Sequence, residues 1–193
     1  MLKLFADLIL KLAGWRVEVT IPEAKKYVLI GAPHTTNWDF PLALLCFWSV
    51  QKPIKWVAKN QLFKGPLKYF FNALGGIPVD RSAPSGFIEQ IASQFEKNEE
   101  MILCLAPEGT RSKTQYWKTG FYYIALTAKV PVCLGYIDYP KRTMGFSEML
   151  LPSGDIDKDF EQIKKFYQDK SGKYPEKQGP IRIKSQQQAK KKL

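Results

Sequence analysis

The stretch that decides the fold is YVLIGAPHTTNWDF, residues 27–40. Its first four residues form a compact apolar run that is bounded by Gly31 and Pro33, a pattern typical of a buried strand. The polar segment that follows leads into residues 40–50, which are apolar and numerous enough for a helix. A buried strand, a polar turn and a helix make up the repeating unit of α/β proteins.

The rest of the chain repeats this alternation. Strands are expected at residues 16–21, 27–30, 54–58, 77–79, 101–105 and 130–139. Helices are expected at residues 2–12, 40–50, 67–74, 85–97, 119–129 and 157–170. Because strands alternate with helices through residues 27–139, the sequence predicts a single α/β domain with a mostly parallel central sheet flanked by helices.

The two ends of the chain differ from this core. Residues 2–12 place apolar side chains at helical spacing, with two lysines and an aspartate on the opposite side. Such an amphipathic helix either covers the core or lies in a lipid interface. After Ser171 the chain becomes polar and basic, and we expect it to fray. The expected parts are an N-terminal amphipathic helix (1–16), the domain (17–170) and a basic flexible tail (171–193).

The net charge of the chain limits the classes of partner that it suits. The 193 residues include 29 Lys+Arg and 18 Asp+Glu, a net charge of +11, and residues 170–193 hold eight basic residues and one acid. A basic excess suits nucleic acid, anionic lipid or phosphorylated substrates. Nucleic acid is disfavoured, because most of the excess lies in one tail and no groove-reading motif is present.

No signal peptide is visible, and no uncharged apolar stretch reaches the roughly 18 residues that cross a bilayer. We therefore expect a cytoplasmic protein that rests on the inner face of the cell membrane as a peripheral protein, without spanning it.

His34, the only histidine, follows the predicted strand directly, at the end where α/β sheets place their ligand sites. Asp39 lies five residues on, a rotation of roughly 140° on a helix, so the two cannot share a helical face. They meet only if His34 lies on the turn and Asp39 in the first helical turn. A carboxylate that holds one imidazole nitrogen leaves the other free as a general base. The alternative is that Asp39 is merely a favourable charge at a helix N-terminus.

A second polar loop, APEGTRS at residues 106–112, follows the apolar strand MILCL. Gly109 lets the backbone approach a ligand, and Thr110 adds a hydroxyl donor. Arg111 presents a planar fork of donors that suits phosphate, and Glu108 is placed to hold that fork. The alternative is an ordinary polar loop with a local ion pair.

Two further clusters are weaker candidates. In LGGIPVDRS, residues 74–82, Asp80 and Arg81 form either a structural salt bridge, which contributes little if exposed, or a second phosphate or acyl-carrier contact. Lys59 lies just past a predicted strand, where a lysine is usually solvated but can also point into the same cleft.

No metal site is indicated, because the three cysteines are scattered through apolar runs. A serine hydrolase is disfavoured because no GxSxG is present.

Four segments of the chain resemble, in their order, the four sequence blocks of the glycerolipid acyltransferases, the 1-acyl-glycerol-3-phosphate (lysophosphatidic acid) acyltransferase family. They are His34-x4-Asp39, GGIPVDR, PEGTR and Val130-Pro131-Val132. The resemblance covers residues 30–135. It implies an α/β fold that needs no cofactor or metal, with acyl-CoA or acyl-carrier protein as donor and a lysophospholipid as acceptor. The catalytic residues that it implies are His34 and Asp39. The residues that it implies for substrate binding are Lys59, Arg81, Glu108, Gly109, Thr110 and Arg111.

Many members of that family carry transmembrane or longer N-terminal helices, whereas this chain offers only residues 2–12. The acceptor is therefore open: 1-acyl-glycerol-3-phosphate, a different lysolipid, or a lipid-like alcohol. A non-catalytic module that binds a membrane surface is the alternative from another class.

Overall fold

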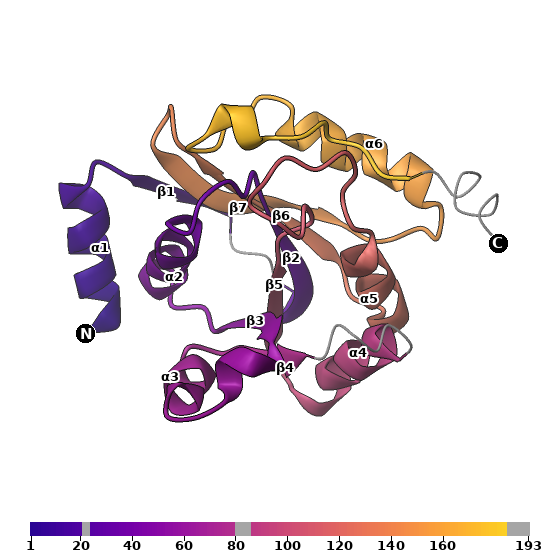
Figure 1. The fold of residues 1–193 in the computed structure, drawn as a ribbon, viewed down its shortest axis with the longest axis horizontal. Helices are drawn as coiled ribbons and strands as arrows, with labels where there is room; N and C mark the ends of the chain where they lie inside the picture. The colour runs from indigo at the N-terminus through magenta and orange to yellow at the C-terminus, as the bar shows by residue number, and fades with distance from the viewer. Residues whose placement is uncertain (21–23, 80–85, 185–193) are drawn as a thin grey trace.

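A central sheet organises the computed structural model, which describes residues 1–20, 24–79 and 86–184 (Figure 1). Within these residues the sheet has seven strands in the order β1-β7-β6-β2-β5-β3-β4. Their bounds are β1 Arg16–Val19, β2 Lys26–Ala32, β3 Ile54–Lys59, β4 Gly76–Val79, β5 Met101–Leu105, β6 Val132–Asp138 and β7 Thr143–Leu150. Neighbouring strands from β6 to β4 are parallel, while β7 runs antiparallel to β6. The predicted α/β domain with a mostly parallel sheet is confirmed.

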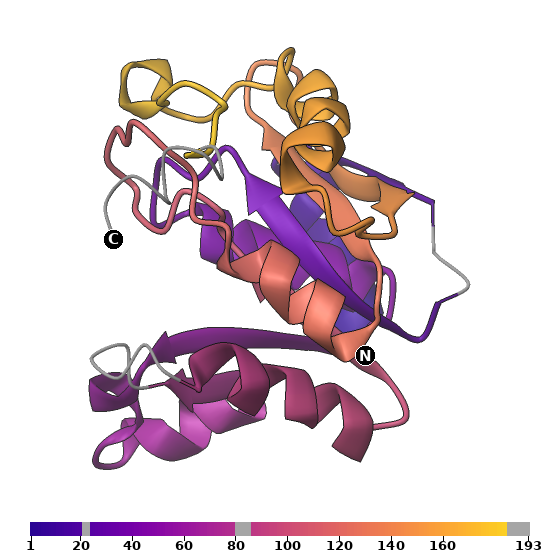
Figure 2. The same ribbon diagram turned by 90° about the vertical axis from the view of Figure 1, so that its right-hand side faces the viewer.

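Helices cover both faces of the sheet. One face carries α1 (Leu2–Leu12) and α2 (Asp39–Ser49). The other carries α4 (Phe87–Lys97), α5 (Gly120–Ala128) and α6 (Ile156–Tyr167), which lie in front in Figure 2. The short α3 (Leu67–Ala73) packs with a 3-10 turn, Asn60–Phe63, beside β4. None of the helices in the described chain has both the length and the apolar character needed to cross a bilayer.

The alternation of side chains along β2 explains why this strand lies at the centre. Val28 and Ile30 are fully buried in the cluster that α4, α5 and α6 cover. Tyr27 and Leu29 point to the opposite face and pack with the cluster under α1 and α2. Because successive side chains of a strand point to opposite faces, an all-apolar strand needs a cover on each side. The carboxyl end of β2 therefore lies at the middle of one edge of the sheet.

One strand escaped prediction. The segment TMGFSEML forms β7, which pairs with β6 over seven residues and with β1 over four. These long-range hydrogen bonds, not local periodicity, make it a strand, and its direction gives the sheet its antiparallel pair.

The C-terminal segment also differs from expectation. Residues 171–184 do not fray but lie along the domain, where the Tyr139 N–H donates to the Ser171 carbonyl and the Trp117 N–H to the Arg182 carbonyl. Gly172 lies against Thr35, where a Cβ atom would come within 2.7 Å of the Thr35 hydroxyl. Hydrogen bonds to distant segments hold this polar stretch, and local composition does not reveal them. Residues 185–193 lie outside the described residues.

Candidate active site

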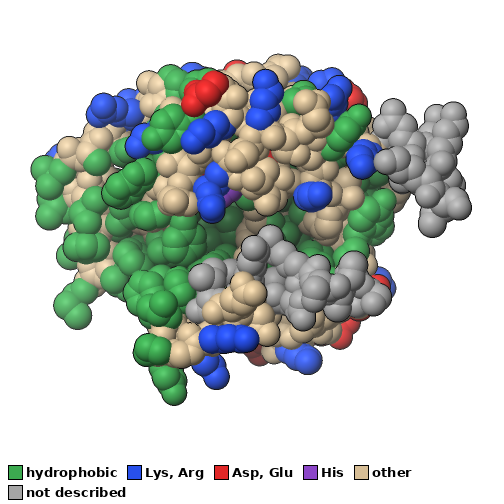
Figure 3. Space-filling view, in the orientation of Figure 1, with side chains coloured by type: hydrophobic (Ala, Val, Ile, Leu, Met, Phe, Trp, Pro, Cys, Tyr) green, Lys and Arg blue, Asp and Glu red, His purple; other side chains and the backbone are tan. Residues whose placement is uncertain are grey.

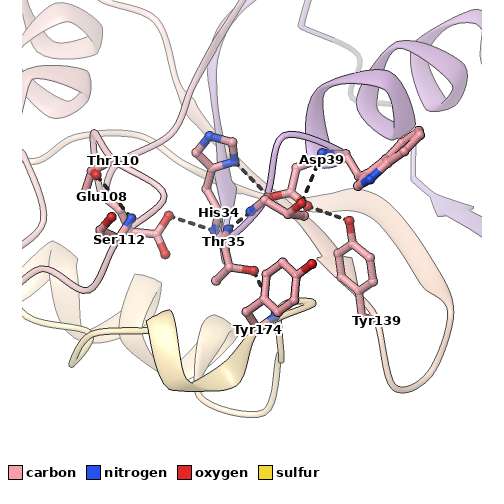
Figure 4. A network of polar contacts seen from close by, with 10 residues as sticks. His34, Thr35, Asp39, Glu108, Thr110, Ser112, Tyr139 and Tyr174 are labelled. Atoms are coloured by element: carbon pink, nitrogen blue, oxygen red, sulfur yellow. Dashed lines mark hydrogen bonds and ion pairs between the residues drawn. The ribbon is translucent and has the colours of Figure 1, made fainter.

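His34 and Asp39 meet at the carboxyl end of β2 (Figure 4). His34 lies on the loop and Asp39 is the first residue of α2, the arrangement that their spacing requires. The His34 Nδ1 lies 2.9 Å from Asp39 Oδ2. The Thr36 hydroxyl accepts from the Trp38 N–H, and α2 has no side-chain cap.

Four hydrogen bonds hold the Asp39 carboxylate, which is only 6% exposed. Oδ2 accepts from His34 and from the backbone N–H groups of Thr35 and Thr36, at 3.0 and 3.1 Å. Oδ1 accepts from the Tyr139 hydroxyl at 2.7 Å. An ionised carboxylate only accepts, so the proton of the imidazole lies on Nδ1 and Nε2 presents its lone pair. This is the protonation state that a general base requires.

Tyr139 is a site residue that sequence analysis missed. It lies between β6 and β7, 100 residues from Asp39, and its ring packs edge-on against Trp15 with centroids 5.1 Å apart. Burial, and then the hydrogen bond to Asp39, raises the pKa of Tyr139 far above its ordinary value. The phenol therefore stays protonated and remains a donor to Asp39. No sequence pattern connects these two residues, so only the fold reveals the contact.

Glu108 supports the same loop from the other side. Its side chain is 6% exposed, and Oε2 accepts from the His34 N–H at 2.9 Å. We expected it to hold Arg111 and, with the loop, to bind phosphate; instead it is turned toward the backbone of His34 (Figure 4). Burial raises the pKa of Glu108 to about 7, although the hydrogen bond from the His34 N–H acts to lower it.

The raised pKa of Glu108 makes stability depend on pH. Because folding favours the protonated acid, its contribution is complete below the ordinary pKa of 4.5 and is lost as the pH rises through about 7. Glu108→Gln keeps an oxygen for the His34 N–H but carries no charge. We expect the variant to match the wild type at pH 4 and to be more stable at pH 8, by at most roughly 3 kcal/mol.

Urea unfolding at pH 4 and pH 8 measures this difference. Glu96→Gln, which removes an exposed carboxylate from α4, is the matched control and should show no pH-dependent gain. Equal stability of Glu108→Gln and wild type at pH 8 would contradict a buried carboxylate of raised pKa.

The loop after β5 faces the same end of the sheet. Gly109 has a φ of +68°, which a residue with a Cβ adopts only with strain. Its N–H donates to the Ala106 carbonyl and closes the turn that brings Thr110 and Arg111 to the cleft. The Arg111 side chain is exposed, and no carboxylate among the described residues forms an ion pair with it. Its guanidinium is therefore available to an anion.

A cleft of about 830 Å³ lies between these two loops, hollowed in Figure 3 beside the single histidine. His34 and Asn37 line one side, and Thr110 and Arg111 line another. A second, mainly apolar cavity of about 220 Å³ adjoins it beneath α2, and the two share His34, Phe40 and Trp56, among others. The site thus offers a base, a cation and an apolar chamber within one connected region.

The other expected site residues are less defined. Lys59 is the last residue of β3, where its backbone pairs with Val79, and its side chain is not among those described. Arg81 lies outside the described residues. Within the described ranges, no three His, Cys, Asp or Glu side chains are grouped to hold a metal. The three cysteines are free thiols, and Cys104 lines the cleft.

Comparisons with known proteins bear on this site. A family model described as Acyltransferase matches residues 16–136. A 1-acyl-sn-glycerol-3-phosphate acyltransferase of Streptococcus pneumoniae (strain ATCC BAA-255 / R6) is 29% identical over 113 residues, which are 58% of this chain and 42% of that protein. One of Cocos nucifera is 34% identical over 94 residues, 46% of this chain and 30% of that protein. The match thus spans less than half the length of these curated relatives.

A solved structure shares the fold. The crystal structure of a 1-acyl-sn-glycerophosphate acyltransferase from Thermotoga maritima aligns with a TM-score of 0.60 and 17% sequence identity. The alignment covers 87% of this chain and 78% of that one, so the likeness extends over nearly the whole domain.

Proposed function

This chain belongs to the acyltransferase family, and on that basis we propose that it transfers an acyl group from acyl-CoA or acyl-carrier protein to the hydroxyl of a lysophospholipid, with 1-acyl-glycerol-3-phosphate as the first acceptor to test. The observation that carries the proposal is the His34–Asp39 pair, with Nδ1 and Oδ2 2.9 Å apart at the edge of a cleft that Arg111 also lines. The names of the curated relatives support this choice of acceptor.

The proposed reaction is a direct transfer without an acyl-enzyme. The His34 Nε2 removes the proton of the acceptor hydroxyl while that oxygen attacks the thioester carbonyl. A new C–O ester bond forms, the C–S bond breaks, and the departing thiolate takes the proton from the imidazolium. Asp39 stabilises the imidazolium, and Tyr139 and Glu108 act as positioning residues through Asp39 and the His34 backbone. General base catalysis contributes about 10²–10⁴-fold, so orientation and electrostatic stabilisation must supply the remainder.

The cleft offers a place for each part of the substrates. The 220 Å³ cavity under α2 is lined mainly by apolar side chains, including Phe47 and Met144, and suits a segment of acyl chain. The Arg111 guanidinium suits the phosphate of the acceptor, because its planar donors pair with two phosphate oxygens. Lys59 and Arg81 are proposed as further phosphate contacts on the basis of the family resemblance alone.

A product assay tests the proposed function. Purified protein is incubated with radiolabelled acyl-CoA or acyl-carrier protein and a panel of lysolipids with and without a phosphomonoester, and the lipids are then separated. We expect labelled product chiefly from 1-acyl-glycerol-3-phosphate. Product from another lysolipid or a lipid-like alcohol would reassign the acceptor. No product with any pair, from protein that binds lipid vesicles, would favour the non-catalytic membrane module.

Arg111→Ala should mainly weaken the binding of the acceptor. Loss of a charge-assisted bond costs about 1.5–3 kcal/mol, so we expect the acceptor KM to rise roughly 10–100-fold while kcat changes little. Steady-state kinetics with varied acceptor measures this. Arg182→Ala is the matched control, because Arg182 is exposed and bonds Gln115 away from the cleft lining. An unchanged acceptor KM in Arg111→Ala would remove the phosphate role.

We also propose a peripheral, cytoplasmic protein on the inner face of the membrane, attached in part through α1. One side of α1 buries Ala6 and Leu10 against the domain, while Leu4, Leu8 and Leu12 on its other sides are exposed. The helix therefore covers the core and still presents an apolar face, the combination found in helices that lie in a lipid interface. The basic C-terminal residues are proposed to add attraction to anionic lipid.

A further inference from the structure

A second apolar face lies on α3, apart from α1. Leu67, Tyr69 and Phe70 are 56%, 78% and 57% exposed, although each is large and apolar or aromatic. Single exposed apolar residues are common on soluble proteins, but here three occur within four residues of a short helix, and Leu67 and Phe70, at i and i+3, are neighbours on its surface. Apolar side chains grouped in this way indicate a surface that is covered in use.

The same helix forms a wall of the cleft. Phe71, next in the chain to the exposed Phe70, lines the cleft together with Trp56 and Gln61. The Phe71 and Trp56 rings lie edge-on with centroids 5.9 Å apart, and the Trp56 indole donates to the Leu74 carbonyl at the end of α3. Anything that covers the outer side of α3 is therefore separated from the cleft by the thickness of one helix.

The charge around α3 favours an anionic partner. No acidic residue occurs between Asp39 and Asp80, whereas this stretch contains five lysines. Lys68 is exposed within α3, and Lys64 is exposed just before it. A short helix that exposes leucine and aromatic side chains, with exposed lysines in and before it, matches the composition of segments that lie in an anionic lipid interface.

Exposed apolar side chains on α1 and α3 are visible in one view of the molecule. Figure 3 shows hydrophobic side chains over α1 at the left and over α3 at the lower left, on the face where the cleft is hollowed.

We propose that α3 lies in the headgroup region of an anionic bilayer together with α1, and that lipid substrates pass from the bilayer over α3 into the cleft. The docking part stands on the exposed face and its charge. The passage of substrate rests on the proposed function. The bilayer is favoured over a protein partner because residues 40–79 include lysines but no acidic residue, and because α1 also exposes large apolar side chains.

Vesicle binding tests the docking part with the intact chain carrying His34→Ala, so that no turnover is involved. Cosedimentation with vesicles of neutral lipid containing roughly 30 mol% anionic lipid, whose negative surface attracts basic segments, gives the partition coefficient. We expect Leu67→Ser/Tyr69→Ser/Phe70→Ser to lower it at least tenfold. Leu151→Ser is the matched control, because Leu151 is 71% exposed but follows the carboxyl end of the antiparallel β7, at the opposite end of the sheet.

A second variant keeps the test valid if the triple variant does not fold. Lys64→Glu/Lys68→Glu changes only exposed side chains and should weaken binding to anionic vesicles at least tenfold, with little effect on neutral ones. Lys158→Glu/Lys165→Glu on α6 makes the same charge change on another face. This control should bind anionic vesicles more tightly than Lys64→Glu/Lys68→Glu does. Unchanged binding of both α3 variants would overturn the proposal. A lipid-free dimer that either α3 variant turns into monomers would assign the face to a second copy and would also overturn it.

Turnover separates this proposal from the proposed function. With catalytically intact chains, the α3 variants should acylate monomeric short-chain lysolipid as the wild type does but lose at least tenfold in rate on vesicle-embedded lysolipid. Equal loss on both substrates would overturn the passage over α3. Absence of turnover in the wild type, with vesicle binding intact, would instead overturn the proposed function and leave the docking face standing.

Discussion

His34→Ala is expected to lower kcat for acyl transfer by about 10²–10⁴-fold, the range that a positioned general base contributes. The imidazole is the only one in the chain, so no neighbouring histidine can replace it. His34 lines the cleft, and its Nδ1 is held by a carboxylate that itself has three other donors. Single-turnover measurements with saturating donor and acceptor report the chemical step directly.

The control for His34→Ala is binding without turnover. Asp39 keeps its bonds to two backbone N–H groups and to Tyr139 in this variant, so we expect the loop to persist. Thermal unfolding and acyl-donor binding should therefore stay close to those of the wild type. A kcat within tenfold of the wild type would rule out His34 as the base.

Asp39→Asn is expected to have an effect of similar size, about 10²–10⁴-fold in kcat. The amide has one acceptor oxygen, whereas the carboxylate accepts four bonds. Its NH₂ group must face a donor, and if it faces His34 the ring is forced to carry its proton on Nε2, where no lone pair is left for the acceptor. Leaving a buried donor without a partner also costs about 1–3 kcal/mol of stability.

Tyr139→Phe separates the two effects of Asp39→Asn. It removes one donor to Oδ1 but leaves the carboxylate and the His34 tautomer in place. We expect a loss in kcat of no more than about tenfold, corresponding to one hydrogen bond of about 1 kcal/mol, and much smaller than that of Asp39→Asn. Equal losses in the two variants, or wild-type kcat in Asp39→Asn, would contradict the role of Asp39 in holding the tautomer.

Most of the fold follows from local patterns. The apolar runs that become β2 and β5 are buried on both faces, so their sequences contain little else. The periodicity of residues 2–12 matches the observed α1 at both ends. β7 could not be found in this way, because its partners β6 and β1 decide its state. The hydrogen bonds of a strand lie outside its own segment, whereas those of a helix lie within it.

The contacts of the site also fall into those that the sequence predicts and those that only the fold reveals. The meeting of His34 and Asp39 was predictable because five residues and one turn bring them together. The contacts of Glu108 and Tyr139 were not, since they span 74 and 100 residues. Glu108 was expected to hold Arg111 and, from the family resemblance, to contact substrate, whereas in the fold its buried carboxylate accepts from the His34 N–H. Likewise the segment at 171–184 looks like a solvated tail until Gly172 and Tyr174 contact Thr35.

The sequence by itself determined the class of fold, the proximity of His34 to Asp39, and the loop that presents Arg111, because each depends on local patterns or on residues close together in the chain. Only the tertiary structure decided what surrounds that pair: the hydroxyl on Asp39, the buried acid beneath His34, the apolar chamber under α2 and the exposed face of α3. These features arise where separate strands and helices pack together. Their contacts follow from the whole arrangement of the sheet, which no single stretch of the chain encodes.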